Sequence, residues 1–283
     1  MLKHEYETIT SRRNALLVET HKLSDRKHRN RTGLFRFDGV KLTAEALSRG
    51  VALTAVLLRE SDAACVLERV FSMCDKEFSS ETRVCFVADP IFDSLSEESA
   101  PEGIICVASM QGDVHRVWTD APDSTERVML LESVRDPSNL GAIIRSAAAF
   151  GVDRLVLSAD CADIYNAKTV RASMGTLFSQ QIDRVDDLTV AIAALRADGR
   201  RVYAAALDER AARLDELDAR AGDCAVIGNE GHGLSAETLA ACTSSVYIPM
   251  TDRAESLNAA VAAAVLMWEF CRADRGDSKG DRK

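Results

Sequence analysis

The second half of the chain alternates short apolar runs with longer segments in which apolar residues recur at helical spacing. Residues 128–131 are continuously apolar, which is typical of a parallel strand covered on both faces. Residues 139–150 then show a helical stripe that ends at Gly151. The alternation continues with predicted strands at 154–157, 202–207, 224–227 and 245–248, and predicted helices at 166–174, 188–197, 236–242 and 257–271. This order indicates an open parallel sheet with helices on both faces.

The first half of the chain has shorter and less regular segments. The predicted elements are a helix over 1–20, a strand and turn over 33–39, a helix over 42–48, a strand over 51–58, a helical region to Phe78, and strands at 84–87 and 104–108, the last two separated by an acidic, polar stretch at 94–101. Together they predict a small α/β domain of roughly a hundred residues.

The two halves are separated by a stretch without sustained periodicity. We therefore predict an α/β domain over 1–110, a linker over 111–127 and a parallel-sheet domain over 128–272. The charged, glycine-containing tail at 273–283 is expected to be disordered.

The composition fits an ordinary globular protein, with 47% hydrophobic residues. The strongly apolar stretch at 259–268 is too short to span a membrane, and the charged N-terminus has no signal-peptide core. We expect a soluble, cytoplasmic protein. The eight cysteines form no CxxC pair and do not cluster with histidines at zinc-ligand spacing, so buried reduced thiols are expected and no metal is predicted.

Positive charge is concentrated at the start of a chain whose net charge is −9. Residues 1–41 contain ten Lys/Arg and five Asp/Glu, whereas residues 42–127 contain seven and sixteen. The basic run 21–31 is suited to neutralising RNA phosphates, and it is equally compatible with a solvated helix end. The candidate RNA-binding residues are Arg26, Lys27, Arg29 and Arg31.

The segment 132–145 leads from the predicted strand 128–131 into a helix. Ligands of open α/β sheets bind at the carboxyl ends of strands, so this loop is well placed for a site. Asp136 or Asn139 can cap the helix. Arg145 projects away from the apolar stripe, so it is available for a phosphate or for catalysis, or it is simply a surface charge.

Two further segments follow later strands. The first, Gly228-Asn-Glu230-Gly-His-Gly, has the glycine order G-x-x-G-x-G, which does not match the dinucleotide-binding fingerprint. It is either a ligand-binding loop or a glycine turn before a helix. In the second, a strand ends at Ile248-Pro-Met250, and Ser256-Leu257-Asn258 opens an alanine-rich helix, with Ser256 as the expected cap. The small residues of that helix suit close packing against another helix, including one from a second subunit.

Together and in this order, the three segments resemble the signature motifs of the SpoU/TrmH family of the SPOUT superfamily of RNA methyltransferases. The matching stretches are Asp136-Pro-Ser-Asn-Leu-Gly-Ala-Ile-Ile-Arg145, Ile227-Gly-Asn-Glu-Gly231 and Ile248-Pro-Met … Ser256-Leu-Asn258. The N-terminal part resembles the family's small substrate-binding domain, through the stretch 29–40. The resemblance implies a catalytic domain with a C-terminal trefoil knot, a homodimer and S-adenosylmethionine as cofactor.

The resemblance also implies roles for particular residues. Gly228, Ile248, Met250 and Leu257 would lie at the cofactor pocket. The conserved polar positions around the reacting centre are matched by Asn139, Arg145, Glu230, Ser256 and Asn258. The implied reaction is methyl transfer to a ribose 2′-hydroxyl of structured RNA.

The alternatives differ in target or in class. Ribosomal RNA is favoured over transfer RNA because of the extra N-terminal domain. A catalytically inactive RNA-binding protein is disfavoured because the polar motif residues are intact. A nucleotide-dependent dehydrogenase is disfavoured by the order of the glycines.

Overall fold

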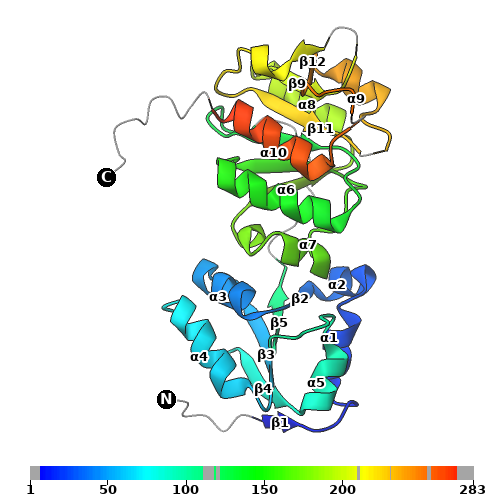
Figure 1. Cartoon of the computed structure of the whole chain (residues 1–283). Helices are drawn as coiled ribbons and strands as arrows, with labels where there is room; N and C mark the ends of the chain where they lie inside the picture. Colours follow the sequence, from blue (N-terminus) through cyan, green and yellow to red (C-terminus); the bar gives the residue numbers. More distant parts are fainter. Residues whose placement is uncertain are drawn as a thin grey trace, which may run out of the picture. The chain divides into compact units, whose positions relative to one another are not determined.

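The computed structural model describes residues 7–110, 118, 122–208, 211–229, 231–253 and 256–272. The chain forms two compact units (Figure 1). The N-terminal unit contains residues 1–112 and 165–179, and the C-terminal unit contains 113–164 and 180–283. The first unit thus includes residues 165–179 from the segment 128–272, for which the sequence analysis proposed a single domain. The predicted tail at 273–283 and most of the predicted linker lie outside the described residues.

The N-terminal unit is built on a five-stranded sheet with the order β1-β4-β3-β5-β2. Strands β1, β4 and β3 run parallel, and β5 is antiparallel to both β3 and β2. The elements are β1 (Glu7–Ile9), α1 (Ala15–Lys22), α2 (Arg26–Thr32), β2 (Leu34–Asp38), α3 (Val40–Arg49), β3 (Leu53–Arg59), α4 (Ala63–Met73), β4 (Arg83–Val87), α5 (Asp89–Leu95), β5 (Ile104–Ser109), α7 (Ala167–Ala172) and the 3-10 turn η1 (Thr176–Phe178).

Helices α1 and α5 cover one face of this sheet, and α3 and α4 lie on the other (Figure 1). The core on the α1 side joins Leu17 and Phe92 of the helices to Leu57 of β3. The expected helix over residues 1–20 is wrong at its start, because residues 7–9 form an edge strand whose Ile9 enters the same core.

Residues 165–179 belong to the N-terminal unit through an aromatic cluster. The ring of Tyr165 lies 4.7 Å from that of Phe35, and the ring of Phe178 lies 5.4 Å from that of Phe37. All four rings are buried. Aromatic pairs at such distances stabilise beyond the apolar area that they bury, so the segment is firmly packed on β2.

The C-terminal unit contains a seven-stranded sheet with the order β10-β12-β9-β11-β6-β7-β8, in which every strand pair is parallel. The elements are β6 (Val128–Leu131), α6 (Pro137–Phe150), β7 (Arg154–Ser158), β8 (Gln181–Val185), α8 (Leu188–Ala197), β9 (Val202–Ala205), β10 (Ala212–Arg213), the 3-10 turn η2 (Leu214–Glu216), β11 (Cys224–Ile227), α9 (Ala236–Ala241), β12 (Ser244–Tyr247) and α10 (Ala259–Phe270). The predicted parallel α/β architecture is confirmed.

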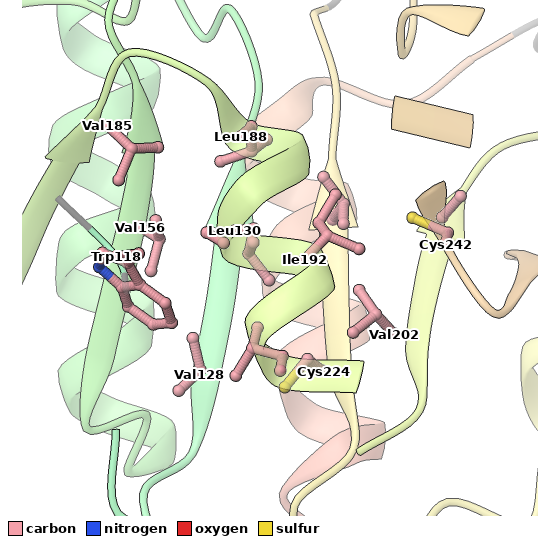
Figure 2. Packing of buried hydrophobic residues seen from close by; sticks show 14 of the residues in the cluster. Trp118, Val128, Leu130, Val156, Val185, Leu188, Ile192, Val202, Cys224 and Cys242 are labelled. Atoms are coloured by element: carbon pink, nitrogen blue, oxygen red, sulfur yellow. The ribbon is translucent and has the colours of Figure 1, made fainter. Parts of the chain in front are cut away.

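Helices cover both faces of this sheet, α6 with α10 on one side and α8 with α9 on the other (Figure 1). On the α8 side, Leu188 and Ile192 pack on Val128 and Leu130 of β6 and on their neighbours (Figure 2). Among the described residues, no helix is both long and apolar enough to cross a membrane.

Strand β8 is absent from the sequence prediction because its polar residues are buried. Asp183 accepts a hydrogen bond from Arg154 Nη1 at 2.8 Å, and Arg184 is 4% exposed with its guanidinium on backbone carbonyls. Buried charges need such partners. The strand lies at the edge of the sheet, and its buried polar residues have partners in distant segments, so the local sequence pattern looks like that of an exposed polar segment.

Trp118 anchors the stretch before β6 in the same core. Its side chain lies in the cluster and is 3% exposed (Figure 2). Its Nε1 donates to Asp183 Oδ2 at 3.1 Å. The Trp118→Ala variant should lose about 3–5 kcal/mol of unfolding free energy, the range for removing a buried aromatic side chain. Urea denaturation of the full chain measures the loss. The Trp118→Phe variant, which keeps a ring but not the N–H donor, should lose less, and equal losses for the two would contradict the account.

Candidate active site

The three motif segments lie at the carboxyl end of the C-terminal sheet. The first follows β6 and the second follows β11, which is the hydrogen-bonded neighbour of β6. The third follows β12, which pairs with β9 on the other side of β11. Strand order therefore brings together segments that are far apart in the sequence, as expected for a ligand site of an open parallel sheet.

The glycine loop after β11 closes on itself by direct backbone contact. Gly228 packs so tightly that a Cβ atom there would lie 2.5 Å from the carbonyl carbon of Gly233. Asn229 and Gly233 exchange two backbone hydrogen bonds, at 3.1 and 3.0 Å. The side-chain oxygen of Asn229 also accepts from the backbone N–H of Gly231 at 2.8 Å. Glycine at position 228 is therefore a packing requirement.

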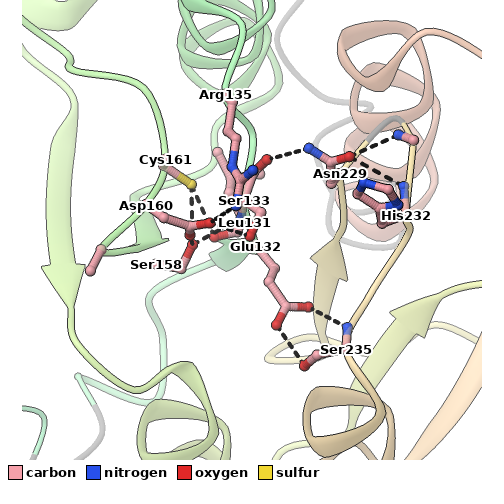
Figure 3. A network of polar contacts seen from close by, with 12 residues as sticks. Leu131, Glu132, Ser133, Arg135, Ser158, Asp160, Cys161, Asn229, His232 and Ser235 are labelled. Carbon is pink, nitrogen blue, oxygen red and sulfur yellow. Dashed lines mark hydrogen bonds and ion pairs between the residues drawn. The ribbon is translucent and has the colours of Figure 1, made fainter.

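Two side chains tie the glycine loop to the loop after β6 (Figure 3). Asn229 Nδ2 donates to the carbonyl of Ser133 at 2.8 Å. The Glu132 carboxylate accepts from Ser235 Oγ at 2.7 Å and from Thr238 Oγ1 at 2.8 Å. Ser133 has a φ of +54°, an uncommon conformation for a residue with a Cβ atom. These bonds hold that conformation and fix the two loops relative to each other.

Asp160, after β7, braces the β6 loop from the other side. Its carboxylate accepts from Ser133 Oγ at 2.6 Å, Ser158 Oγ at 2.7 Å and Arg135 Nη2 at 2.8 Å (Figure 3). Partial burial raises the pKa of Asp160, but these three donors outweigh it and lower the pKa to about 2. The carboxylate is therefore ionised at neutral pH and remains an acceptor.

The first and third motifs meet through two asparagines. Asn258 Nδ2 donates to Asn139 Oδ1 at 2.9 Å. The backbone N–H of Asn139 donates to Asp136, the cap of α6, at 2.8 Å. Asn258 also caps α10, accepting from Ala260 at 3.0 Å. The expected cap, Ser256, lies two residues before the true one, and it is exposed beside the helix start.

Arg145 lies on α6 and is exposed, whereas Ile143 and Ala147 of the apolar stripe are buried. Its guanidinium forms no hydrogen bond or ion pair with another described residue. The structure does not bring it into contact with Asn139 or Asn258. Glu230, the remaining predicted catalytic residue, lies outside the described residues.

A cavity of about 200 Å³ lies beside the ends of β9 and β12. Ile248, Met250 and Leu257, the predicted cofactor residues, line it together with Ser256. Gly228 is not among the lining residues. The walls are mostly apolar.

The predicted RNA-binding residues lie on α2 of the N-terminal unit. Arg26, Lys27 and Arg31 are exposed. Arg29 is a correction to the prediction, because it is 3% exposed and its Nη1 donates to the carbonyls of Leu23 at 2.6 Å and Ser24 at 2.8 Å. A guanidinium held by its own backbone is not available to an RNA phosphate.

Among the described residues there is no group of His, Cys, Asp and Glu side chains that could hold a metal ion. The eight cysteines, all among the described residues, form no disulfide; six are buried, and Cys65 is exposed. Burial raises the pKa of Cys106 and Cys224 to about 12, so both are protonated, inert thiols.

Two family models match the chain. The SpoU rRNA Methylase family matches residues 126–268, and the MRM3-like substrate binding domain matches residues 14–106. The chain belongs to the SpoU rRNA methylase family. The resemblance of the motifs is thus confirmed, and with it the prediction of a methyltransferase domain that follows a substrate-binding domain.

The relatives match across both units. The chain is 29% identical over 262 residues to the 23S rRNA (guanosine(2553)-2′-O)-methyltransferase RlmP of Bacillus subtilis, covering 93% of this chain and 98% of the relative. It is 30% identical over 273 residues to the 23S rRNA (uridine(2479)-2′-O)-methyltransferase of Streptomyces viridochromogenes, covering 93% and 91%. The structure of the SpoU methyltransferase AviRb from S. viridochromogenes in complex with AdoMet matches with a TM-score of 0.79 at 28% identity, covering 93% of this chain and 99% of that chain.

The sequence prediction did not single out Asn229, Glu132 or Asp160 as residues of the site. Asn229 had a usable signal, because asparagine between glycines is typical of a side chain that bonds to its own turn. No sequence signal pointed to Glu132 or Asp160. Glu132 bonds to Ser235, about a hundred residues later, and Asp160 lies outside the three motif segments.

Alanine at position 228 tests the glycine loop. The Gly228→Ala variant should lose about 1–3 kcal/mol of unfolding free energy, the usual cost of overpacking, because its Cβ meets rigid backbone. Gly231→Ala is the matched control, since a Cβ there lies 3.5 Å from the nearest atom. Thermal melting of both variants measures the difference, and equal melting temperatures would refute the packing requirement.

Proposed function

We propose that this chain transfers a methyl group from S-adenosylmethionine to a ribose 2′-hydroxyl in ribosomal RNA, specifically that of the large subunit. One observation carries the proposal. The hydrogen bonds Asn258–Asn139 and Asn229–Ser133 join the three motif segments, and residues of the third segment line a cavity. The target is supported by relatives that match both units and are named for 23S rRNA. Such a substrate places the reaction in the cytoplasm.

The residues of the cavity suit the cofactor. Ile248, Met250 and Leu257 would hold its adenosine part between apolar walls and strand-end backbone groups. When bound, S-adenosylmethionine supplies an electrophilic methyl group on a sulfonium. The exposed hydroxyl of Ser256 lies at the same cavity and would contact the ligand or the ribose.

Arg145 would bind RNA at the reacting nucleotide. A guanidinium stays protonated in proteins, so it does not serve as the base. It would instead bind the adjacent phosphate and stabilise the oxyanion that develops as the hydroxyl loses its proton to that phosphate or to water. Asn139, held by Asn258, would orient the RNA or Arg145. We place Glu230 among the groups that hold the glycine loop and the ribose.

The family resemblance also supports a trefoil knot and a homodimer. The tight glycine loop at Gly228–Gly233 is compatible with such a knot. Helix α10 leaves two large apolar side chains exposed, Val261 and Trp268, each at 49%. An exposed apolar helix face of this kind fits packing against the same helix of a second copy.

A methylation assay tests the function. Purified protein and radiolabelled S-adenosylmethionine are incubated with total ribosomal RNA and, separately, with total transfer RNA, both from a strain that lacks the gene. We expect label in ribosomal RNA as an alkali-resistant dinucleotide. The Arg145→Ala variant should lose about 100- to 1000-fold in kcat, the cost of removing one charge-stabilising donor. Arg220→Ala, which removes another exposed arginine of the same unit, should leave kcat unchanged.

Three results would contradict these assignments. Label in transfer RNA alone would replace the substrate. Cofactor binding without methylation of naked or ribosome-assembled RNA would indicate an inactive RNA-binding protein. Near-normal activity of Arg145→Lys would show that the bidentate geometry of arginine is dispensable and refute its proposed role.

The dimer is tested by placing a charge on α10. Val261→Asp should shift the full chain from dimer to monomer in sedimentation velocity, because the buried carboxylate would be unpaired. Val190→Asp is the matched control, since Val190 is similarly exposed, at 48%, on α8 of the same unit. A wild-type chain that sediments as a monomer would overturn the dimer proposal.

A further inference from the structure

A second cavity lies on the N-terminal unit, away from the three motif segments, and His21 and Lys22 at the start of the basic run 21–31 line it. It has a volume of about 240 Å³ and is lined by residues of α1 and α5 and by Arg12. Its apolar lining residues are Leu17, Val18, Ile91 and Leu95, and its polar lining residues are Arg12, His21, Lys22 and Ser94. Drug-sized ligands occupy pockets of about 300–1,000 Å³, so this one is suited to a single flat ring system.

The rim of this cavity combines positive charge with flat side chains. Arg12 and His21 are exposed, and their side chains form no hydrogen bond or ion pair with another described residue. Lys22 is paired with Glu19 at 2.7 Å. Among the lining residues there is no carboxylate. Arg12 therefore supplies a positive charge at the cavity that no described carboxylate pairs with, in a chain whose net charge is −9.

The apolar floor offers one polar contact. Ser94 Oγ donates its proton to the carbonyl of Ile91 at 2.8 Å, which leaves its lone pairs free to accept. The apolar side chain of Val18 is 37% exposed at the floor, whereas its neighbour Leu17 is buried. Val18 can therefore contact a ligand. These features match an unpaired nucleotide. Its base would lie on the apolar floor and stack on the planar side chains of Arg12 and His21, and the cations would bind its phosphates.

We propose that this α1–α5 cavity binds one unpaired nucleotide of the RNA substrate, at a site separate from the methylated ribose. The proposal rests on the proposed function, since it specifies how the substrate is held. Positive charge disfavours a basic or neutral protein segment as the occupant, and the match of residues 14–106 to a substrate binding domain favours RNA over an acidic segment. The exposed residues Arg26, Lys27 and Arg31 of α2 follow α1 directly in the chain and would continue the phosphate contacts.

The test compares single-stranded with double-stranded RNA, using the full chain without cofactor. The probe is a short adenosine-rich RNA that contains 2-aminopurine, free or annealed to its complement. Val18→Asp should weaken binding of the single strand about 5- to 100-fold, the range for one stacked base, and should leave duplex binding much less affected. Val190→Asp, on the C-terminal unit, is the matched control and should bind like wild type.

Arg12→Ala tests the charge. It should weaken single-strand binding and reduce the slope of log affinity against log salt by about one, as expected for one lost phosphate contact. Arg49→Ala removes an exposed arginine at the end of α3, on the other face of the sheet, and should change neither quantity. In the methylation assay both cavity variants should raise KM for ribosomal RNA and leave kcat unchanged.

Unchanged single-strand binding by Val18→Asp and Arg12→Ala, with normal melting temperatures, would overturn the proposal. So would equal weakening of single-strand and duplex binding, because that would indicate a general charge effect. Tighter binding after removal of residues 1–6 would show that the chain's own N-terminus fills the cavity, which would also overturn it. A wild-type chain that methylates no RNA, combined with a selective effect of Val18→Asp, would refute the proposed function and leave this site standing.

Discussion

Backbone touches backbone where the chain leaves β11, and the arrangement of the site depends on this contact. Only a residue without Cβ can occupy position 228, because the carbonyl group of Gly233 fills the space. With the loop closed, Asn229 faces Ser133, and Ser235 lies at the Glu132 carboxylate. A wider loop would break both connections, and the loop after β6 would lose the bonds that hold Ser133 at positive φ. The shape of one glycine loop thus controls the position of a second segment almost a hundred residues away in the sequence.

Buried guanidiniums hold much of the surrounding loop structure. Arg184 Nη1 and Nη2 donate to the carbonyls of four residues between 158 and 162, and Arg200 donates to the carbonyls of Pro122, Asp123 and Glu126. Arginine suits this task because its planar group carries five donors and stays charged. Arg29 does the same between α1 and α2. Arg145 differs in being exposed, with its donors directed to no described residue, which is the state that a group needs in order to bind a substrate phosphate.

Sequence periodicity predicted the elements whose burial is uniform. Strand β6 and helix α8 have the predicted bounds, because every residue of β6 is buried and the stripe of α8 is regular. Periodicity did not predict β8, because its buried residues Asp183 and Arg184 are polar and form hydrogen bonds with residues elsewhere in the sequence. At 165–179 the pattern predicted the helix but gave no sign of its packing partner, β2. The Asn139–Asn258 contact spans 119 residues and follows from strand order, so only the motif resemblance could suggest it.

The acidic character of the chain constrains how it can bind RNA. A net charge of −9 repels a polyanion at long range, and salt at physiological concentration screens this repulsion beyond about 8 Å. Binding must then rely on short-range contacts where the local charge is positive. Arg145 on α6 and the basic residues along α1 and α2 are candidates for such contacts, and they belong to different units. An RNA that must satisfy both is selected by its fold as well as by the target nucleotide, whereas a strongly basic protein would bind any RNA. Sparse positive charge on an acidic chain is therefore consistent with an enzyme that must find one ribose among many.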